Sequence, residues 1–425
     1  MELVVSGSRV SGRVEAPPSK SYTHRGVLAG ALGDGTRVLN PLRSADTEAS
    51  IRCARGLGAS VEEKEDGMLI DGVDGAPETP GDVLDCGNSG TTTRLFAGIA
   101  SLIDGLAVLT GDESLRSRPN GPLLSSLREL GATARSTRGD GRAPLVVGDS
   151  LKGGETNIDG GVSSQFISSL LFATPLTNGA TVTVDGTLKS RPYVDITIEV
   201  LSEMGIEVDE TDEGFDVPGG QSYSAEEFQV PGDFSSASYP LAAGAVAGEA
   251  TVENLYPSAQ GDEAILGILE RMGASVEWNH KEGVARVTGK ADGLAGVTFD
   301  ASDNPDLTPT VAALGAAAGG ETRIVDAEHV RYKETDRLEA MATELGKMGA
   351  VVEEEDDALY IDGESSELVG TRVDGRDDHR VVMALAVAGL VANGETAIET
   401  AESVEVSYPG FADDLAALGA EVGTR

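Results

Sequence analysis

Apolar residues recur along the chain in a pattern that repeats about every 70 residues. Before Gly349, the residues Leu338, Ala342 and Leu345 follow the spacing of one helix face, and a β-like run begins directly after the glycine. A glycine at the end of a helix predicts a left-handed cap. The same combination of helix, Leu-Gly or Met-Gly pair and strand occurs six times, with its glycine at Gly58, Gly131, Gly205, Gly273, Gly349 and Gly419.

A second pattern lies between these copies. A polar segment opens a helix of small apolar residues, a glycine ends the helix, and a strand follows, as in GDFSSASYPLAAGAVAGEATVENL. Small side chains let a helix approach its neighbours closely, so we expect this helix to be buried and the amphipathic helix to cover it. The six copies begin at Ser19, Gly87, Val162, Gly232, Asp303 and Asp377. Periodicity alone leaves open whether six such units form a solenoid or close into two groups of three.

Net charge is the feature of the composition that departs most from the ordinary. The chain has 71 acidic and 32 basic residues, a formal net charge of −39, spread over its whole length with peaks such as EEKED (62–66) and EEEDD (353–357). Dispersed charge repels itself in dilute buffer and is screened when the Debye length falls to about 3 Å near 1 M salt. We therefore expect a halophilic cytoplasm and no nucleic-acid partner.

Other local signals predict absences. The N-terminal MELVVSG has neither the basic nor the apolar region of a signal peptide, and no uninterrupted apolar run reaches about 18 residues, so we expect no leader and no membrane span. Cys53 and Cys86 stand in no metal or redox spacing and are predicted to be buried thiols in a reducing cytoplasm. The histidines are not grouped as ligands. We therefore expect no metal and no cofactor.

The starts of the predicted helices carry an unusual share of the few basic residues. A helix N-terminus presents free N–H groups and a partial positive charge, which suits phosphate and carboxylate groups. Serine and threonine at such places are commonly caps, and a run such as RYKETDRL (331–338) is commonly solvated surface. The set as a whole predicts a convergent anion site, because it contains Lys20, Arg25, Arg94, Arg118, Lys333, Arg337 and Arg380.

Nine ordered motifs run from residue 17 to about 390: PSKSYTHR, GNSGTTTR, SRPNGPL, SSQFISSLL, SRPYVDIT, GDFSSASY, NPDLTPT, RYKETDRL and DDHRVVMALAVAGL. Together they resemble those of the shikimate-pathway enolpyruvyl transferase family. The resemblance implies the two-domain enolpyruvyl transferase fold, an α/β (α+β) protein of six βαβαββ-type units, three per domain, in an inverted α/β barrel. One domain would comprise residues 20–231 and the other residues 1–19 with 232–425; we expect a monomer.

The family reaction moves the enolpyruvyl group of phosphoenolpyruvate to the 5-hydroxyl of shikimate 3-phosphate and releases phosphate. By this resemblance, Asp306 accepts the hydroxyl proton, Glu334 protonates the methylene carbon, and Lys20 completes the catalytic set. Shikimate 3-phosphate would be bound by Lys20, Ser21, Arg25, Ser163, Ser164, Gln165, Ser190, Tyr193, Asp306 and Lys333. Phosphoenolpyruvate would be bound by Lys20, Gly90, Arg118, Gln165, Arg337 and Arg380.

The chain departs from the family pattern at two places, and two other functions compete. His329 stands where many relatives have Asn, and Val406 where some have a phosphoenolpyruvate-binding Lys. The sister transferase acting on UDP-N-acetylglucosamine typically has Asn after the first Lys and a catalytic-loop Cys, whereas this chain has Ser21 and no cysteine beyond Cys86. A non-catalytic repeat scaffold fits the periodicity, but it would not need the carboxylates and arginines of the site.

Overall fold

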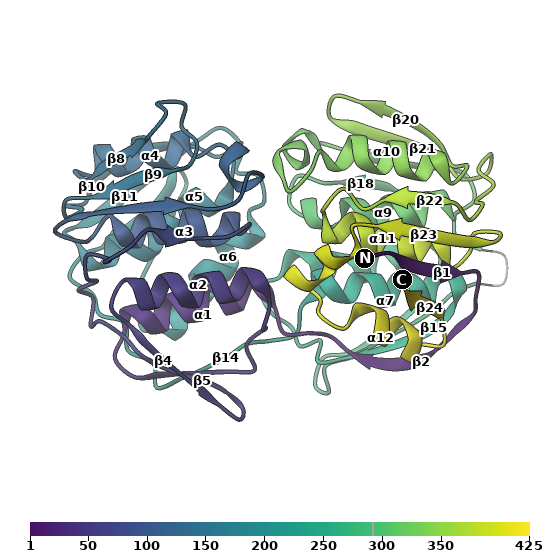
Figure 1. Cartoon of the computed structure of the whole chain (residues 1–425), viewed down its shortest axis with the longest axis horizontal. Helices are drawn as coiled ribbons and strands as arrows, with labels where there is room; N and C mark the ends of the chain where they lie inside the picture. Colours follow the sequence, from purple (N-terminus) through teal and green to yellow (C-terminus); the bar gives the residue numbers. More distant parts are fainter. Residues whose placement is uncertain (291–292) are drawn as a thin grey trace. The chain divides into compact units, whose positions relative to one another are not determined.

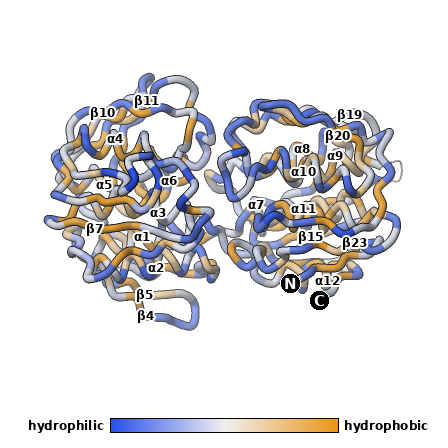
Figure 2. Tube along the Cα trace, turned by 45° about the horizontal axis from the view of Figure 1, so that its top comes forward, coloured by the Kyte–Doolittle hydropathy of each residue, from blue (hydrophilic) through white to orange (hydrophobic). Residues whose placement is uncertain are grey.

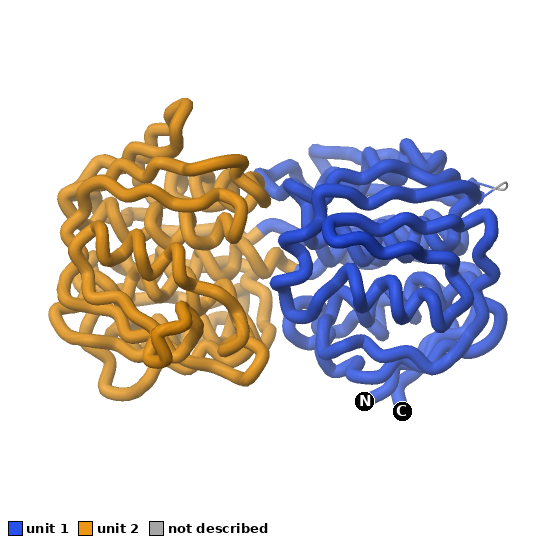
Figure 3. The backbone as a smooth tube through the Cα atoms, turned by 90° about the horizontal axis from the view of Figure 1, so that it is seen from above, with its two compact units in different colours: residues 1–17, 231–425 blue, residues 18–230 orange. Residues whose placement is uncertain are grey.

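The computed structural model describes residues 1–290 and 293–425. These residues form two compact units (Figure 3). Unit 1 contains Met1–Pro17 and Pro231–Arg425, and unit 2 contains Pro18–Val230. The chain therefore passes from one unit to the other twice, after Pro17 and after Val230.

The described part of unit 2 contains three four-stranded sheets built on one plan (Figure 1). In each sheet the first two strands are parallel and the remaining pairs are antiparallel. The sheets, in strand order, are β14 (Glu227–Gln229), β3 (Thr36–Leu39), β5 (Gly67–Asp71) and β4 (Ser60–Lys64); β6 (Leu84–Asp85), β7 (Leu106–Thr110), β9 (Leu145–Gly148) and β8 (Thr133–Ser136); β10 (Gly154–Asp159), β11 (Gly179–Asp185), β13 (Gly214–Pro218) and β12 (Asp209–Thr211).

Unit 1 repeats the plan in three further sheets of described residues. The N-terminal strands complete two of them, because Val14 pairs with Val252 and Val5 pairs with Thr396. The sheets are β2 (Val10–Glu15), β15 (Gly248–Glu253), β17 (Val284–Thr288) and β16 (Ser275–Asn279); β18 (Thr298–Asp300), β19 (Glu321–Val325), β21 (Ala358–Asp362) and β20 (Val351–Glu355); β22 (Arg372–Asp374), β23 (Glu395–Glu399), β1 (Leu3–Ser6) and β24 (Glu421–Thr424).

Each sheet is accompanied by two helices of different character, as the pattern predicts. The first helix is almost wholly buried, and the second buries one face. Figure 2 shows hydrophilic stretches in outer turns such as that between β4 and β5. The buried helices are α1 (Lys20–Leu32), α3 (Gly90–Ala100), α5 (Ser164–Ala173), α7 (Phe234–Ala247), α9 (Thr308–Ala316) and α11 (His379–Gly389). The covering helices are α2 (Ala45–Gly56), α4 (Gly121–Glu129), α6 (Pro192–Glu203), α8 (Ala264–Met272), α10 (Arg337–Lys347) and α12 (Phe411–Ala417).

Glycine has the two roles that the sequence predicts. At Gly98 on α3 an added Cβ would lie 2.5 Å from the carbonyl oxygen of Ser169 on α5, so the close contact of these two helices requires a residue without a side chain. The predicted left-handed caps are confirmed, since φ is 106° at Gly58, 94° at Gly131, 78° at Gly205, 100° at Gly273, 93° at Gly349 and 96° at Gly419. The predicted six-unit α/β fold is thus confirmed.

Two smaller expectations can be compared with the structure. Cys53 and Cys86 are both buried and free, with their Sγ atoms 4.0 Å apart, which confirms that they are buried thiols. Among the described residues, no helix is both long enough and apolar enough to span a bilayer.

Candidate active site

In unit 1, three carboxylates meet around the guanidinium of Arg337. Its Nε donates to Asp378 Oδ2 at 2.8 Å, its Nη1 to Asp306 Oδ1 at 2.8 Å, and its Nη2 to Glu334 Oε2 at 2.7 Å. The second oxygen of Asp306 accepts from Arg380 Nη2 at 2.8 Å. Only 1% of the Arg337 side chain is exposed. The two predicted catalytic carboxylates and both arginines predicted in this unit therefore form one array.

Helix starts place the members of this array. Asp306 lies in a 3₁₀ turn, Pro305–Leu307, that leads into α9, and Arg337 is the first residue of α10. Asp378 is the N-cap of α11 and accepts from the backbone N of Arg380 at 2.9 Å. A carboxylate at a helix start is stabilised by free N–H groups and by the helix dipole, and charge-assisted bonds to a guanidinium fix its direction.

The charges of the array keep Arg337 cationic. Burial alone would lower its pKa, but the negative charges of Asp378, Glu334 and Asp306 outweigh burial, and the pKa of Arg337 is raised. Two guanidinium groups face three carboxylates, so any anion that binds here competes with protein carboxylates for the same donors. The array therefore places two carboxylates, a residue type that can take or give a proton, beside two cationic donors.

A further buried carboxyl, Asp262, lies close enough to feel the charge of Asp306. It belongs to the 3₁₀ turn Gly261–Glu263 before α8, and the hydroxyl of Ser235 donates to its Oδ2. Burial first and the charge of Asp306 second raise the pKa of Asp262 to about 7, against the opposing effect of the Arg380 charge. The direction of the shift favours the neutral form of Asp262 more than for an ordinary aspartate.

In unit 2, α1 presents Lys20 as its first residue. Lys20 Nζ donates to Asp46 Oδ2 at 3.2 Å, and the two side chains are 14% and 11% exposed. Asp46 lies in the first turn of α2, whose N-cap Ser44 accepts from the backbone N of Thr47. Unlike most of the acidic residues of the chain, Asp46 is buried, and it holds the ammonium group at the start of α1.

Arg25 joins α1 to α6. Its Nε donates to Thr197 Oγ1 at 2.8 Å, its Nη1 to the Ser21 carbonyl at 2.9 Å, and its Nη2 to the Tyr193 carbonyl at 2.9 Å. Burial lowers the pKa of Arg25 to about 10, so it is still cationic at neutral pH. The guanidinium therefore brings Ser21 and Tyr193, both predicted to bind shikimate 3-phosphate, to the same place. Ser190, two residues before α6, is also buried and has φ of 56°.

The starts of α3 and α5 are joined through Gln165. Its Oε1 accepts from Arg94 Nη1 at 2.8 Å, and its Nε2 donates to Thr91 Oγ1 at 2.8 Å. Arg94 Nη1 also reaches Ser163 Oγ at 3.4 Å, and Ser164 is the first residue of α5. Arg94 belongs to the predicted anion site but was assigned to neither substrate, and it contacts two residues that were assigned.

Arg118 lies against the start of α3. Its Nη2 donates to Asn88 Oδ1 at 2.8 Å and to Ser114 Oγ at 3.1 Å, and the residue is 7% exposed. A Cβ added to Gly90 would lie 3.1 Å from Arg118 Nη1, so the predicted phosphoenolpyruvate contacts Gly90 and Arg118 are adjacent.

The predicted residues divide between the units. Ten of them lie in unit 2: Lys20, Ser21, Arg25, Gly90, Arg118, Ser163, Ser164, Gln165, Ser190 and Tyr193. Five lie in unit 1: Asp306, Lys333, Glu334, Arg337 and Arg380. Both departures from the family pattern, His329 in the 3₁₀ segment Glu328–Tyr332 and Val406 at the end of Ala401–Val406, also lie in unit 1.

Sequence reasoning missed three buried carboxylates of these clusters: Asp46, Asp262 and Asp378. Asp378 and Asp262 occur in DDHR and QGDE, each at the start of a helix, which was the available signal. With 71 acidic residues in the chain, their type alone did not distinguish them.

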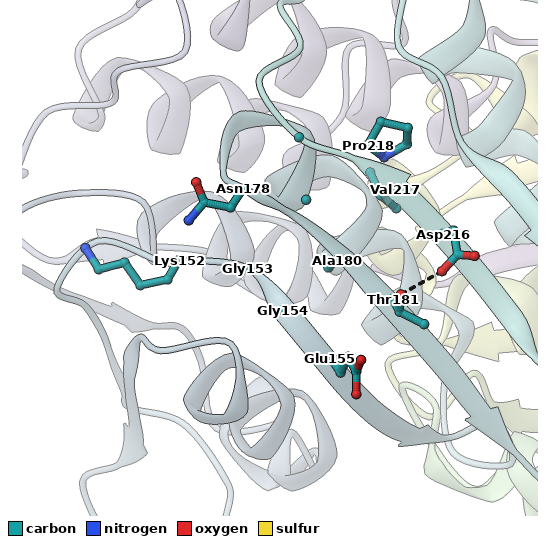
Figure 4. A pocket seen from close by; sticks show the side chains of 12 residues that line it. Lys152, Gly153, Gly154, Glu155, Asn178, Ala180, Thr181, Asp216, Val217 and Pro218 are labelled. Atoms are coloured by element: carbon teal, nitrogen blue, oxygen red, sulfur yellow. Dashed lines mark hydrogen bonds between the residues drawn. The ribbon is translucent and has the colours of Figure 1, made fainter.

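A groove of about 650 Å³ in unit 2 is separate from these residues (Figure 4). Its lining includes Lys152, Asn178 and Thr181, and the Thr181 hydroxyl donates to Asp216 Oδ1 at 2.7 Å. The groove lies where β10 and β11 begin, whereas α5 begins beyond the far end of β10. None of the predicted site residues lines it.

Solved structures share this fold over the whole chain. The EPSP synthase of Acinetobacter baumannii matches with a TM-score of 0.83 and 28% sequence identity, covering 100% of both chains. The enolpyruvyl transferase NikO from Streptomyces tendae matches with a TM-score of 0.78 and 20% identity, covering 99% of this chain and 98% of that one. The fold is that of the enolpyruvyl transferases, which confirms the predicted fold.

Sequence comparison defines the family. The family description EPSP synthase (3-phosphoshikimate 1-carboxyvinyltransferase) matches residues 4–415. A 3-phosphoshikimate 1-carboxyvinyltransferase from Methanothrix thermoacetophila is 57% identical over 423 residues, covering 99% of both chains. Another from Natronomonas pharaonis is 53% identical over 440 residues, covering 100% of both. The chain belongs to the EPSP synthase family and is a transferase, so neither the scaffold nor the UDP-N-acetylglucosamine alternative is favoured.

Proposed function

We propose that the chain transfers the enolpyruvyl group of phosphoenolpyruvate to the 5-hydroxyl of shikimate 3-phosphate and releases phosphate, a step of aromatic amino acid (chorismate) biosynthesis. The observation that carries the proposal is the array in which Asp306 and Glu334 share the buried Arg337 guanidinium. Full-length relatives named 3-phosphoshikimate 1-carboxyvinyltransferase support it. The reaction needs one group to take a proton, one to give a proton, and cations for two anionic substrates.

The chemistry assigns different tasks to the two carboxylates. When the 5-hydroxyl oxygen bonds to the phosphate-bearing carbon, the hydroxyl proton goes to Asp306 and the methylene carbon takes a proton from Glu334. The methyl group then returns a proton to the Glu334 carboxylate, and the bond between the carbon and the phosphate oxygen breaks, which restores the double bond and releases phosphate. An anion bound at Arg337 competes with Glu334 for the donors of the guanidinium.

Unit 2 contains most of the other residues that the proposal assigns to substrate binding, and Lys333 lies in unit 1. Lys20 contacts both substrates at the start of α1. Shikimate 3-phosphate is bound by residues of α1, α5 and α6, and phosphoenolpyruvate by residues beside α3. The support is that these side chains and carbonyls gather at the starts of helices, where N–H groups and cations favour anions. Guanidinium groups suit planar carboxylate and phosphate groups better than lysine does.

Phosphate release with two acceptors tests the reaction. With phosphoenolpyruvate present, we expect the purified chain to release phosphate when shikimate 3-phosphate is added and not when UDP-N-acetylglucosamine is added. Release with UDP-N-acetylglucosamine alone would assign the chain to the sister reaction. No release with either acceptor, from a sample that melts cooperatively in molar KCl, would contradict both enzyme functions.

We propose that the chain works as a monomer in a salt-rich cytoplasm. The support is the net charge of −39 spread along the chain. Thermal melts from dilute buffer to molar KCl are expected to show a rising midpoint, because salt screens the repulsion between surface carboxylates. A midpoint independent of KCl would contradict the salt dependence. A midpoint that rises with protein concentration at fixed salt would contradict the monomer.

A further inference from the structure

The turn of residues 374–378 leads from β22 into α11, and α10 holds it at two points. At the first point, Arg337 Nε donates to Asp378 Oδ2 at 2.8 Å. The second point is Glu344, seven residues further along α10. Because seven residues make about two helical turns, Arg337 and Glu344 lie on one face of the helix.

The side chain of Glu344 is completely buried, and both of its oxygens contact this turn. Oε2 accepts from the backbone N of Asp374 at 2.9 Å, and Oε1 accepts from Arg376 Nε at 2.9 Å. Lys347, with 45% of its side chain exposed, donates to the same carboxylate at 2.7 and 2.9 Å. A buried carboxylate is tolerated only where such bonds replace water. Glu344 therefore joins α10 firmly to the turn.

The turn needs such support, because two successive residues have left-handed backbones. φ is 55° at Arg376 and 54° at Asp377, a region that side-chain-bearing residues seldom occupy. Asp374 Oδ1 accepts from the Arg376 N at 2.8 Å, and Thr400 Oγ1 accepts from the Asp377 N at 3.2 Å. Unfavourable backbone conformations persist where surrounding contacts hold them. Glu344 supplies part of that support, through the backbone N of Asp374 and the guanidinium of Arg376.

The position of this turn decides where α11 begins. Asp378 caps α11 through the N–H of Arg380, and the Arg380 guanidinium in turn binds Asp306. A displaced turn would therefore move both Arg380 and Asp378, the carboxylate that accepts from Arg337 Nε.

We propose that Glu344 is a positioning residue for the reaction: by holding the 374–378 turn, it keeps Arg380 and Asp378 in register with Arg337 and Asp306. Glu344 touches no reacting atom in this proposal. The expected effect on the kinetics rests on the proposed function. The expected effect on the structure of the turn rests on its two contacts with α10.

The test is Glu344→Gln, which keeps the size of the side chain and removes its charge. We expect kcat/KM for phosphoenolpyruvate to fall about 10- to 100-fold, the cost of misplacing catalytic groups by about 1 Å. KM for shikimate 3-phosphate should change by less than about twofold, because most of its proposed contacts lie in unit 2. Amide hydrogen exchange at residues 374–382 should become faster. The matched control is Lys347→Met, which removes only the exposed partner of Glu344 and should behave as wild type.

Three results would overturn the proposal. The first is a lower melting midpoint with unchanged kinetics and unchanged exchange, measured in molar KCl where both proteins are folded. The second is an equal kinetic loss in Lys347→Met. If Glu344→Gln does not fold, Arg376→Gln replaces it in the test, because it removes the same contact from the side of Arg376, whose side chain is 29% exposed. The third contradicting result is then an Arg376→Gln protein with wild-type kinetics and wild-type amide exchange. A wild-type chain that releases no phosphate contradicts the proposed function instead, and the exchange measurement still decides the role of Glu344.

Discussion

Asp306→Asn is expected to fold, to bind shikimate 3-phosphate and to turn over about 10²- to 10⁴-fold more slowly, the usual contribution of a general acid or base. Its amide oxygen still accepts one hydrogen bond from Arg337 or Arg380, but the amide cannot take the proton of the 5-hydroxyl. The measurement is phosphate release at saturating concentrations of both substrates, with a thermal melt of the same sample.

The control for this variant is Asp303→Asn, an exposed aspartate three residues earlier in the same loop. It changes the net charge equally and leaves the array intact, so its turnover should equal that of wild type. If Asp306→Asn keeps most of its turnover and loses only stability, Asp306 is a structural partner of the two arginines. A loss of binding without a loss of kcat would make it a substrate contact rather than the base.

The repeating fold was predictable because its determinants are local. A helix of small residues, an amphipathic helix and a left-handed glycine each have a sequence pattern of fixed period, and Gly58 and Gly349 show the conformation that the pattern requires. The pairing of distant strands was not predictable in this way. Val14 pairs with Val252, which lies more than half the chain away in sequence, and neither local sequence determines which strand it pairs with.

The cationic half of the candidate site was easier to predict than the anionic half. Basic residues are scarce in this chain, so Lys20, Arg337 and Arg380 stood out at helix starts. Acidic residues are abundant, and Asp378 resembles many surface aspartates until the fold brings Arg337 to it. Glu344 is likewise one acidic residue of an amphipathic helix in the sequence, and in the fold it is buried and accepts from Arg376, which belongs to a later segment.

Glu334→Gln tests the proposed transfer of a proton from Glu334 to the methylene carbon of phosphoenolpyruvate. The side chain of Glu334 is 21% exposed and binds Arg337, so an ordinary alternative is an ion pair three residues apart on a helix entry. Such a pair contributes about 0.2–0.5 kcal/mol to stability and little to rate. A proton donor instead contributes about 10²- to 10⁴-fold. Gln retains a hydrogen bond to Arg337 and carries no transferable proton, so we expect a folded protein with turnover reduced by that factor.

Deuterium incorporation separates the donor role from general damage to the site. In D₂O, the wild-type reaction is expected to place deuterium on the carbon that was the methylene of phosphoenolpyruvate, and Glu334→Gln should lose this incorporation together with phosphate release. Glu328→Gln, an exposed glutamate in the preceding 3₁₀ segment, is the matched control and should retain both. If Glu334→Gln still incorporates deuterium at the wild-type rate, another group protonates the carbon, and the role of Glu334 is to hold Arg337.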